Sequence, residues 1–526
     1  EMCIRDSVKA TDKTQVPEPN VETEHYVQFS IDIKPPTVVV KDPQNGVFRR
    51  EVNSISGTAD DDFSGVDTIM LRILEVNTTS QWNGVAFVDT GEYWLSVSTS
   101  NPGLPDWQYT GITNSDWTSG YTYKLIPSGT DKAQNEVVNY STSTFYYDNT
   151  APTSTVVSPQ NDTYYRASVL NSLEGTSEDK PTGTGLVNAG LSQVHIQLYD
   201  VNEDKYWTDS GWSSTTVQWL LATGTTDWSY SFNPANWTTG HKYLITPRGT
   251  DAIGNVETVL STATFYIDSD DPTSVITIPA QNANVAQLDE IDGTSIDYPQ
   301  GGGLYNSGVS NIKVQIYDLT TGSTGYWNGN TWQQGEIWLN AGGTGSWYWT
   351  VVYSTMWENG HTYRIKSKAT DDAGNIETPS AGTVFNFDTE APQSAVTSPA
   401  DGEYVKYLDT VSGTSSDNLS GVKTVYVSIK RNSDGYYYNK NTEVFENTGG
   451  TPIWNDIGTA ASPWSFSVST GVWENGITYT IQSKAEDNVT SPSSNMEVPV
   501  SSNTFTFDTS IPVSGVSVPE ITSLPV

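Results

Sequence analysis

The stretch Phe145-Tyr146-Tyr147-Asp148-Asn149-Thr150-Ala151-Pro152 has a pattern that returns along this chain and decides its fold. In each copy an apolar strand pattern ends at an aspartate, and a proline follows that aspartate four residues later. Four of the aspartates are spaced 120 residues apart, and another lies 116 residues upstream; together they are Asp32, Asp148, Asp268, Asp388 and Asp508. Self-similarity at a fixed long period is typical of an array of like domains. The chain is therefore predicted to be a tandem repeat.

The segments between these aspartates have the pattern of β-strands. Val194-His195-Ile196-Gln197-Leu198 alternates apolar and other residues, as a strand with one buried face does. No segment shows a sustained helical period, so the sequence predicts an all-β tandem array of four Greek-key β-sandwiches, placed end to end. The predicted repeats cover residues 33 to 148, 149 to 268, 269 to 388 and 389 to 508, with the tail of a preceding repeat at 8 to 32 and the start of a further one at 509 to 526.

The most specific pattern lies late in each copy, where a tryptophan precedes a glycine by three residues and a tyrosine by six. These tryptophan and tyrosine pairs are Trp117 and Tyr123, Trp237 and Tyr243, Trp357 and Tyr363, and Trp473 and Tyr479. In this pattern the chain resembles the bacterial immunoglobulin-like repeats, which are close to fibronectin type III and cadherin-type domains. The resemblance spans roughly residues 33 to 508 and implies immunoglobulin-like sandwiches. It implies little about function, because such domains serve many roles.

Composition excludes several classes of partner. The chain has 61 acidic and 25 basic residues and a formal net charge of −36, which repels nucleic acid and disfavours an anionic lipid surface. No run approaches the roughly 18 apolar residues that span a bilayer, so no membrane insertion is predicted. The acidic excess does suit cation binding.

The amino terminus departs from the repeat. Residues 9 to 12 match residues 368 to 371, but Asp6 stands where the other copies have an apolar strand residue. Residues 2 to 7 resemble a translated sequencing adapter, so we interpret residues 1 to 7 as an artefact and expect them to lie outside any sheet. Without Cys3 the chain has no cysteine, and thiol chemistry is then excluded.

Aromatic residues between the middle strands allow two interpretations. Trp207, Trp212 and Trp219 illustrate the pattern in the second copy. Such residues can stack on sugar rings, which favours a glycan-binding module, or they can cover the open side of a sandwich. We expect Trp357 to lie in the core and Trp327 at an edge.

No catalytic constellation is found, and the chain is predicted not to be an enzyme. His241 and His361 stand where the other copies have Tyr121 and Ile477, which indicates a surface strand position. No nucleophile elbow, phosphate-binding glycine loop or His/Cys metal set is present.

Three series of carboxylates recur in register. One closes the preceding unit, the second lies four residues after a Gly-Thr glycine, and the third ends the penultimate strand. In chain order they are Asp32, Asp61, Asp131, Asp148, Asp179, Asp251, Asp268, Asp297, Asp371, Asp388, Asp417 and Asp487. The immunoglobulin-like resemblance implies that the three series meet at each junction between domains. Such a group suits Ca²⁺, which takes six to eight oxygen ligands; the alternative is that each aspartate only caps its own turn.

The sequence thus favours a stalk segment of a secreted or surface-anchored microbial protein, an adhesin above all, located outside the cell. Its partners would be further repeats of the same chain and, through a head domain outside this sequence, surface glycans or host-cell proteins. The alternatives are a glycan-binding module that uses the aromatic edges and an accessory region of an extracellular hydrolase.

Overall fold

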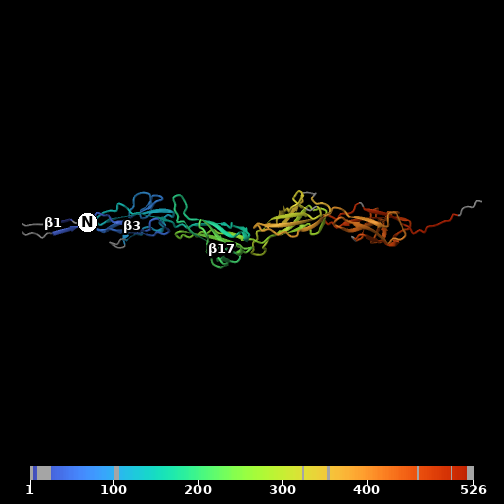
Figure 1. Cartoon of the computed structure of the whole chain (residues 1–526), viewed down its shortest axis with the longest axis horizontal. Coiled ribbons are helices and arrows are strands. Elements are labelled where there is room, and N and C mark those ends of the chain that lie inside the picture. Colours follow the sequence, from blue (N-terminus) through green and yellow to red (C-terminus); the bar gives the residue numbers. More distant parts are fainter. Residues whose placement is uncertain are drawn as a thin grey trace, which may run out of the picture. The chain divides into compact units, whose positions relative to one another are not determined.

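A computed structural model shows two compact units, each made of two repeats (Figure 1). The structure describes residues 4–8, 25–99, 106–322, 325–351, 356–458, 461–498 and 500–517. The first unit comprises Glu1–Asp268 and Gly301–Tyr305, and the second comprises Ser269–Gln300 and Asn306–Val526. Within the described residues, no helix is long and apolar enough to cross a membrane.

Each repeat is a sandwich of a smaller and a larger sheet, so the predicted all-β fold of four sandwiches is confirmed. In repeat 1 the smaller sheet has the order β10-β11-β5-β3 and the larger β4-β13-β12-β6-β7-β8, with β9 also beside β6. Their bounds are β3 Thr37–Asp42, β4 Val47–Arg49, β5 Ile55–Asp60, β6 Val66–Glu75, β7 Gln81–Trp82, β8 Phe87–Val88, β9 Leu95–Ser96, β10 Ser98–Thr99, β11 Asp106–Tyr109, the 3₁₀ helix η1 Asn114–Asp116, β12 Tyr121–Asp131 and β13 Ser143–Tyr147.

Repeat 2 has the same arrangement, with sheets β14-β16-β21 and β15-β23-β22-β17-β18-β19 and with β20 beside β17. The bounds are β14 Thr153–Ser158, β15 Thr163–Tyr165, η2 Ala167–Val169, β16 Ser172–Glu178, β17 Leu191–Asp200, β18 Lys205–Trp207, β19 Trp212–Ser214, β20 Leu220–Leu221, β21 Asp227–Ser231, η3 Pro234–Asn236, β22 Lys242–Asp251 and β23 Ala263–Ile267.

Repeats 3 and 4 follow the same plan. Repeat 3 consists of β24 Thr273–Ile278, β25 Ala283–Val285, β26 Glu290–Ile296, β27 Val309–Asp318, β28 Gly325–Trp327, β29 Trp332–Gln333, β30 Leu339–Asn340, β31 Gly342–Gly343, β32 Ser346–Thr350, β33 His361–Asp371 and β34 Thr383–Phe387. Repeat 4 consists of β35 Gln393–Ser398, β36 Glu403–Val405, β37 Thr410–Ser416, β38 Val422–Arg431, β39 Tyr437–Asn439, β40 Val444–Glu446, β41 Asn455–Asp456, β42 Trp464–Ser467, η4 Thr470–Val472, β43 Ile477–Asp487 and β44 Ser501–Phe507.

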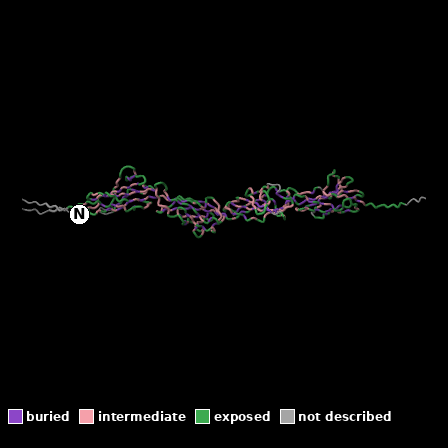
Figure 2. Tube along the Cα trace, turned by 45° about the horizontal axis from the view of Figure 1, so that its top comes forward, coloured by how far each residue is buried: buried purple, intermediate pink, exposed green. Residues whose placement is uncertain are grey.

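One connection gives every repeat its immunoglobulin-like wiring. The chain starts in the smaller sheet and then crosses to the larger one, where a three-residue strand pairs parallel to the last strand; β15 pairs with β23 in this way. The crossing makes β4, β15, β25 and β36 the outer strands at one edge of their sheets. Each repeat carries buried residues along its strands (Figure 2), and its buried apolar residues form one core cluster.

The tryptophan–glycine–tyrosine pattern forms one corner of each core. In repeat 2 the indole Nε1 of Trp237 donates to the carbonyl of Leu170 at 2.8 Å, and the Tyr243 hydroxyl accepts from the backbone N–H of Thr238 at 3.0 Å. Gly240 lies between them with a φ of +79°, a conformation that other residues rarely adopt. The same bonds recur in the other three repeats.

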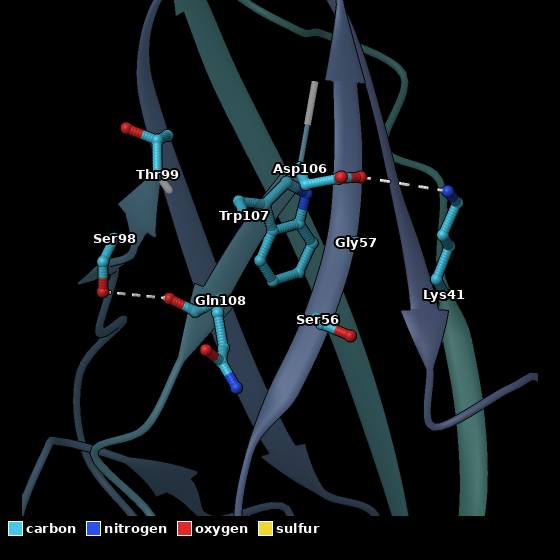
Figure 3. A pocket seen from close by; sticks show the side chains of 8 residues that line it. All are labelled: Lys41, Ser56, Gly57, Ser98, Thr99, Asp106, Trp107 and Gln108. Atoms are coloured by element: carbon cyan, nitrogen blue, oxygen red, sulfur yellow. Dashed lines mark hydrogen bonds and ion pairs between the residues drawn. The ribbon is translucent and has the colours of Figure 1, made fainter. Parts of the chain in front are cut away.

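A second tryptophan explains the glycine of each Gly-Thr pair. The ring of Trp107 lies across Gly57, and a Cβ atom on this glycine would fall 2.3 Å from a ring carbon (Figure 3). Gly175, Gly293 and Gly413 lie under Trp228, Trp347 and Trp464 in the same way. Only glycine leaves room for the ring at this position.

Two expectations about the ends and edges are wrong. Residues 4 to 7 do lie in a sheet, because β1 (Ile4–Val8) pairs with β2 (His25–Phe29). Ile4 pairs with Phe29 as Tyr123 pairs with Phe145, so the segment keeps the register of a penultimate strand in spite of Asp6. This pairing gives the adapter resemblance no support, and Cys3 lies outside the described residues.

Trp327 is also not an edge residue. It is 4% exposed, against 7% for Trp357, and both belong to the core of repeat 3. The short hairpin β28–β29 folds the Trp327 ring inward, where it contacts Trp332 at 5.3 Å between ring centroids. The aromatic stretch therefore covers the open side of the sandwich.

Candidate functional site: the acidic junctions

Three buried carboxylates meet where repeat 1 passes into repeat 2. Asp148 follows β13, Asp179 follows β16, and Asp251 ends β22. Each offers a carboxylate oxygen within 4.8 Å of those of the other two, and all three residues are at most 5% exposed. The prediction that these three residues approach one another agrees with this geometry.

Backbone N–H groups hold the three carboxylates in place. Asp148 accepts from Thr150 at 3.1 Å and from Ala189 at 2.8 Å. Asp179 accepts from Lys180 and Gly190, the latter bond being 2.6 Å. The loop between β16 and β17 therefore fixes two carboxylates at once through its successive amides.

Asn255 ties the last hairpin of repeat 2 to the end of repeat 1. Its backbone N–H donates to Oδ1 of Asp251 at 2.7 Å, and its side-chain Nδ2 donates to Oδ2 of the same residue at 2.6 Å. The same Nδ2 lies 3.1 Å from the carbonyl oxygen of Asp148. This amide therefore bridges the two repeats beside the carboxylates.

The electrostatics of this group disfavour three free negative charges. Burial, with added repulsion from Asp148 and Asp251, raises the pKa of Asp179 to about 6. Burial is also the main cause that raises the pKa of Asp148, and the charge of Asp251 adds to it. A positive charge among the three would remove this penalty.

A second complete group lies between repeats 3 and 4 and consists of Asp388, Asp417 and Asp487. Asp388 accepts from Ser420 N–H at 2.9 Å, and Asp417 accepts from Gly421 N–H at 2.7 Å. Asn495 repeats the bridge, with 2.7 Å to Asp487 and 3.1 Å to the Asp388 carbonyl. The loop after Asp417 is seven residues shorter than that after Asp179, yet the same amides converge on the carboxylates.

One oxygen of this group has no partner. Asp417 Oδ1 is buried and accepts no hydrogen bond, although its other oxygen accepts several. A buried acceptor without a donor costs about 1–3 kcal/mol. Asp61 Oδ1 is in the same situation at the start of repeat 1.

The first junction is built differently from the expectation. Asp32 and Asp61 group with Asp62, and Asp131 is not a member of that group. Lys34 forms an ion pair with Asp62 at 2.7 Å, which draws this acid toward the start of the repeat. Gln134 adopts a φ of +72° in the hairpin, as its place opposite the glycines of other copies predicts.

The remaining predicted set is divided between the two compact units. Asp268 closes the first unit, whereas Asp297 and Asp371 belong to the second. Within the second unit, Asp297 accepts from Gly308 N–H at 2.6 Å and Asp371 from Asn375 N–H at 2.7 Å, as their counterparts do. That the three residues meet stays a prediction.

Sequence reasoning missed the amides that complete these sites. They come from a small residue followed by glycine before the long middle strand: Ser64-Gly65, Ala189-Gly190, Ser307-Gly308 and Ser420-Gly421. The glycines have φ between +80° and +82°, which turns their N–H groups toward the carboxylates. The recurrence of this pair in register is the signal that could have found it.

The interpretation of the histidines as surface residues is wrong for His241. It is 8% exposed, and its Nδ1 lies 2.8 Å from Oδ2 of the fully buried Asp200. His361 forms the same pair with Asp318 at 2.8 Å. The signal was the aspartate at the end of the middle strand, which occurs in the two repeats that have the histidine; the other two have Glu75 and Arg431 there.

Comparison with known proteins gives likeness of fold only. No protein-family model and no curated protein matches the chain. Among solved structures, it is similar to a tetra-tandem repeat from the extending region of a large adhesion protein, with 16% identity, 90% of this chain and 99% of that chain covered, and a TM-score of 0.34.

Two bacterial adhesins give similar values. A structure from a 1.5-MDa bacterial ice-binding adhesin matches at 16% identity over 68% of this chain and all of that chain, with a TM-score of 0.31. A Ca²⁺-stabilized adhesin of an Antarctic bacterium matches at 14% identity over 91% of this chain and all of that chain, with a TM-score of 0.27. At such TM-scores the likeness carries no argument about function, so the function must be argued from the residues of this chain.

Proposed function

We propose that this chain is a spacer segment of a secreted or surface-anchored microbial protein, and that Ca²⁺ at its acidic junctions stiffens it. The observation that carries the proposal is the convergence of three carboxylates from two successive repeats, seen in the Asp148 and Asp388 groups. Ca²⁺ takes hard oxygen ligands and tolerates irregular geometry. A cation held by both repeats would resist their bending.

The residues present fit such an ion. Three carboxylates within 4.8 Å of one another supply charge, and the unpartnered oxygens Asp417 Oδ1 and Asp61 Oδ1 are acceptors that a cation would satisfy. Turn capping explains why each aspartate accepts bonds from neighbouring amides. It does not explain why the carboxylates of three separate turns lie close together. The cation hypothesis accounts for both features.

A spacer role follows from how successive repeats are joined. Only residues 149 to 152 separate the end of repeat 1, at Asp148, from the start of β14 at Thr153. Such a connection has no Gly/Ser linker and leaves little freedom between neighbours. The net charge of −36 keeps the chain soluble in an aqueous exterior. An adhesin whose binding head lies outside this sequence is the protein that we infer.

A glycan-binding role has less support, because the aromatic faces are occupied. Trp207 and Trp327 are buried in their cores. The rings of Trp219, Trp338 and Trp454 are covered by Arg248, Lys368 and Lys484, with the charged groups 3.9, 4.3 and 4.5 Å from the ring centroids. At most one face of each of these rings is left for a sugar.

The pocket of about 350 Å³ on the smaller sheet of repeat 1 does not change this conclusion. Figure 3 shows polar side chains at its rim, with the Lys41–Asp106 ion pair at 3.9 Å. The one aromatic residue that lines it, Trp107, is 2% exposed. It presents no open ring face on which a sugar could stack.

Calorimetric titration of the full chain with Ca²⁺ tests the proposal, followed by melting in Ca²⁺ and in chelator. Ca²⁺ at a hundredfold excess over its Kd should stabilise the folded state by about 2.7 kcal/mol per site. Asp251→Asn should abolish one binding event. It should lower the stability of repeat 2 more in Ca²⁺ than in chelator, where only one of the two bonds from Asn255 is lost. The matched control is Asp227→Asn, which removes an exposed charge from the same repeat. No heat of binding, together with equal melting in Ca²⁺ and chelator, would leave turn capping as the only role of these acids.

A further inference from the structure

We infer that the residue just after the short edge strand of a repeat is a dock for the last hairpin of the next repeat, and that the dock has two interchangeable forms. One form uses an arginine side chain and a short hairpin. The other uses backbone bonds and a hairpin that is four residues longer. The inference concerns direct contacts between repeats and does not rest on cation binding.

The backbone form lies in the second unit. There the hairpin after β43 runs from Asp487 to Asn495, and its Ser491 forms a parallel bridge to Val285 at the end of β25. The N–H of Ala286 donates to the Ser491 carbonyl at 2.7 Å, and that of Thr490 donates to the Asn284 carbonyl at 3.0 Å. The longer hairpin thus adds a short strand to the open edge of the repeat 3 sheet.

The side chains strengthen this contact. Thr490 Oγ1 donates to the Asn284 carbonyl at 3.3 Å, and Asn284 Nδ2 donates to the Asn488 carbonyl at 3.4 Å. No carboxylate takes part in any of these bonds. The contact therefore needs no cation to neutralise it.

The side-chain form lies in the first unit. Arg50 follows β4 as Ala286 follows β25, and its Nη1 donates to the carbonyl of Gly254 at 2.8 Å. Gly254 lies in the short hairpin from Asp251 to Asn255. Among the described residues no backbone bridge joins this hairpin to β4, and the arginine side chain makes the contact instead. One exposed bond from a flexible side chain holds two domains less firmly than several backbone bonds do.

The length of the hairpin and the residue that follows the edge strand vary together inside one chain. The long hairpin faces an alanine, which leaves space for a backbone approach, and the short hairpin faces an arginine, which supplies reach. The hairpins agree at both ends, because Asn495 bonds Asp487 as Asn255 bonds Asp251. The hairpins can therefore be exchanged without disturbing the acidic group.

The test is a swap in the full chain. In the first variant, residues 488 to 494 are replaced by the Ala-Ile-Gly of positions 252 to 254, and in the second the same change is combined with Ala286→Arg. Nitroxide labels at two exposed positions, Tyr348 in repeat 3 and Tyr404 in repeat 4, report the width of the distance distribution by pulsed electron resonance. Cys3→Ser removes the native thiol.

We expect the short hairpin alone to broaden the distribution of distances between the two labels. Adding Ala286→Arg should narrow this distribution again, and both effects should occur in Ca²⁺ and in chelator alike. Amide exchange at Thr490 in the unaltered chain should be slowed about tenfold or more, as two ordinary hydrogen bonds would give. A short-hairpin variant as narrow as the parent would overturn the inference, and so would a dock that is lost in chelator. If chelator broadens all variants equally and the swap has no effect, the junction is held by the cation alone.

A second variant does not depend on the graft folding. Arg50→Ala changes an exposed side chain and should broaden the distance between labels at Val85 in repeat 1 and Val259 in repeat 2. Lys406→Ala is the control, because Lys406 holds the same position in repeat 4 and is exposed. An unchanged width in Arg50→Ala would refute the side-chain form.

Discussion

Replacing Glu257 by valine should weaken repeat 2 strongly, because this carboxylate joins its two sheets. Glu257 is buried and accepts from the N–H of Ser154, in β14 of the smaller sheet, at 2.8 Å. Its second oxygen accepts from the N–H of Gly249, in β22 of the larger sheet, at 2.9 Å. Glu377 makes the corresponding bonds in repeat 3, and in repeat 4 Glu497 accepts from the Ser394 hydroxyl and from the N–H of Ala485.

The size of the effect follows from the two donors. Each buried N–H left without an acceptor costs about 1–3 kcal/mol, so the two together cost about 2–6 kcal/mol. Burying a valine side chain returns about 1.5 kcal/mol of this. The net loss should lie between about 0.5 and 4.5 kcal/mol. Repeat 1 carries Val38 and Val137 at the positions of Ser154 and Glu257, and both valines are buried. The double variant Ser154→Val with Glu257→Val should therefore recover part of the loss.

Hydrogen exchange read by mass spectrometry is the assay, because it reports each repeat separately in a chain that need not unfold in one step. The loss should appear in peptides of repeat 2 and leave repeat 4 unchanged. Glu174→Val, on the exposed face of β16, serves as the control and should change stability by no more than about 0.5 kcal/mol. If Glu257→Val costs no more than this control, the carboxylate does not join the sheets energetically.

Three further predictions concern repeats 2 and 3. Trp327→Ala should lower the free energy of unfolding of repeat 3 by about 3–5 kcal/mol, as much as Trp357→Ala, since both rings are buried. If hydrogen exchange shows a far smaller loss for Trp327→Ala, then Trp327 lies at the edge of the sandwich. Tyr243→Phe should lower the free energy of unfolding of repeat 2 by about 1 kcal/mol, because the Thr238 N–H loses its acceptor. An unchanged stability would show that this hydrogen bond does not stabilise the corner of the core. In chelator, repeat 2 should gain stability as pH falls from 7 to 5. The pKa of Asp179 is about 6 when folded and 3.8 when unfolded, so the folded state takes up the proton first, and the gain over this range is about 1.3 kcal/mol. A melting temperature that decreases steadily as pH falls from 7 to 5 in chelator would refute this third prediction.

The parts of the fold that sequence predicted are those with local or periodic signals. The Trp237-to-Tyr243 pattern is short and recurs in register, and the bond from the Thr238 N–H to the Tyr243 hydroxyl closes within five residues. The aspartate series could be followed for the same reason. Their meeting point was inferred from the wiring of an immunoglobulin-like sandwich and not from the spacing alone.

What the sequence did not reveal depends on partners far along the chain. Glu257 meets Ser154 across 103 residues, and no spacing within one repeat indicates that contact. The buried place of His241 depends on Asp200, 41 residues away. Trp327 was assigned to the wrong face because β28 has only three residues, too few for alternation to show which side is inside.

The acidic junction is unfavourable when it stands alone, and this property suits a conditional joint. Burial and mutual repulsion raise the pKa values of Asp148 and Asp179 because the folded junction holds charges that it does not neutralise. An apolar junction of the same size would be stable under all conditions and could not respond to the medium. On the proposed function, the carboxylates make stiffness depend on external Ca²⁺, while the hairpin docks keep neighbouring repeats in contact without it. The first junction, with Lys34 beside Asp62 and without Asp131, already carries a positive charge. It should therefore gain least from Ca²⁺, and a calcium titration that stabilised repeat 1 as much as repeat 2 would contradict this division of roles.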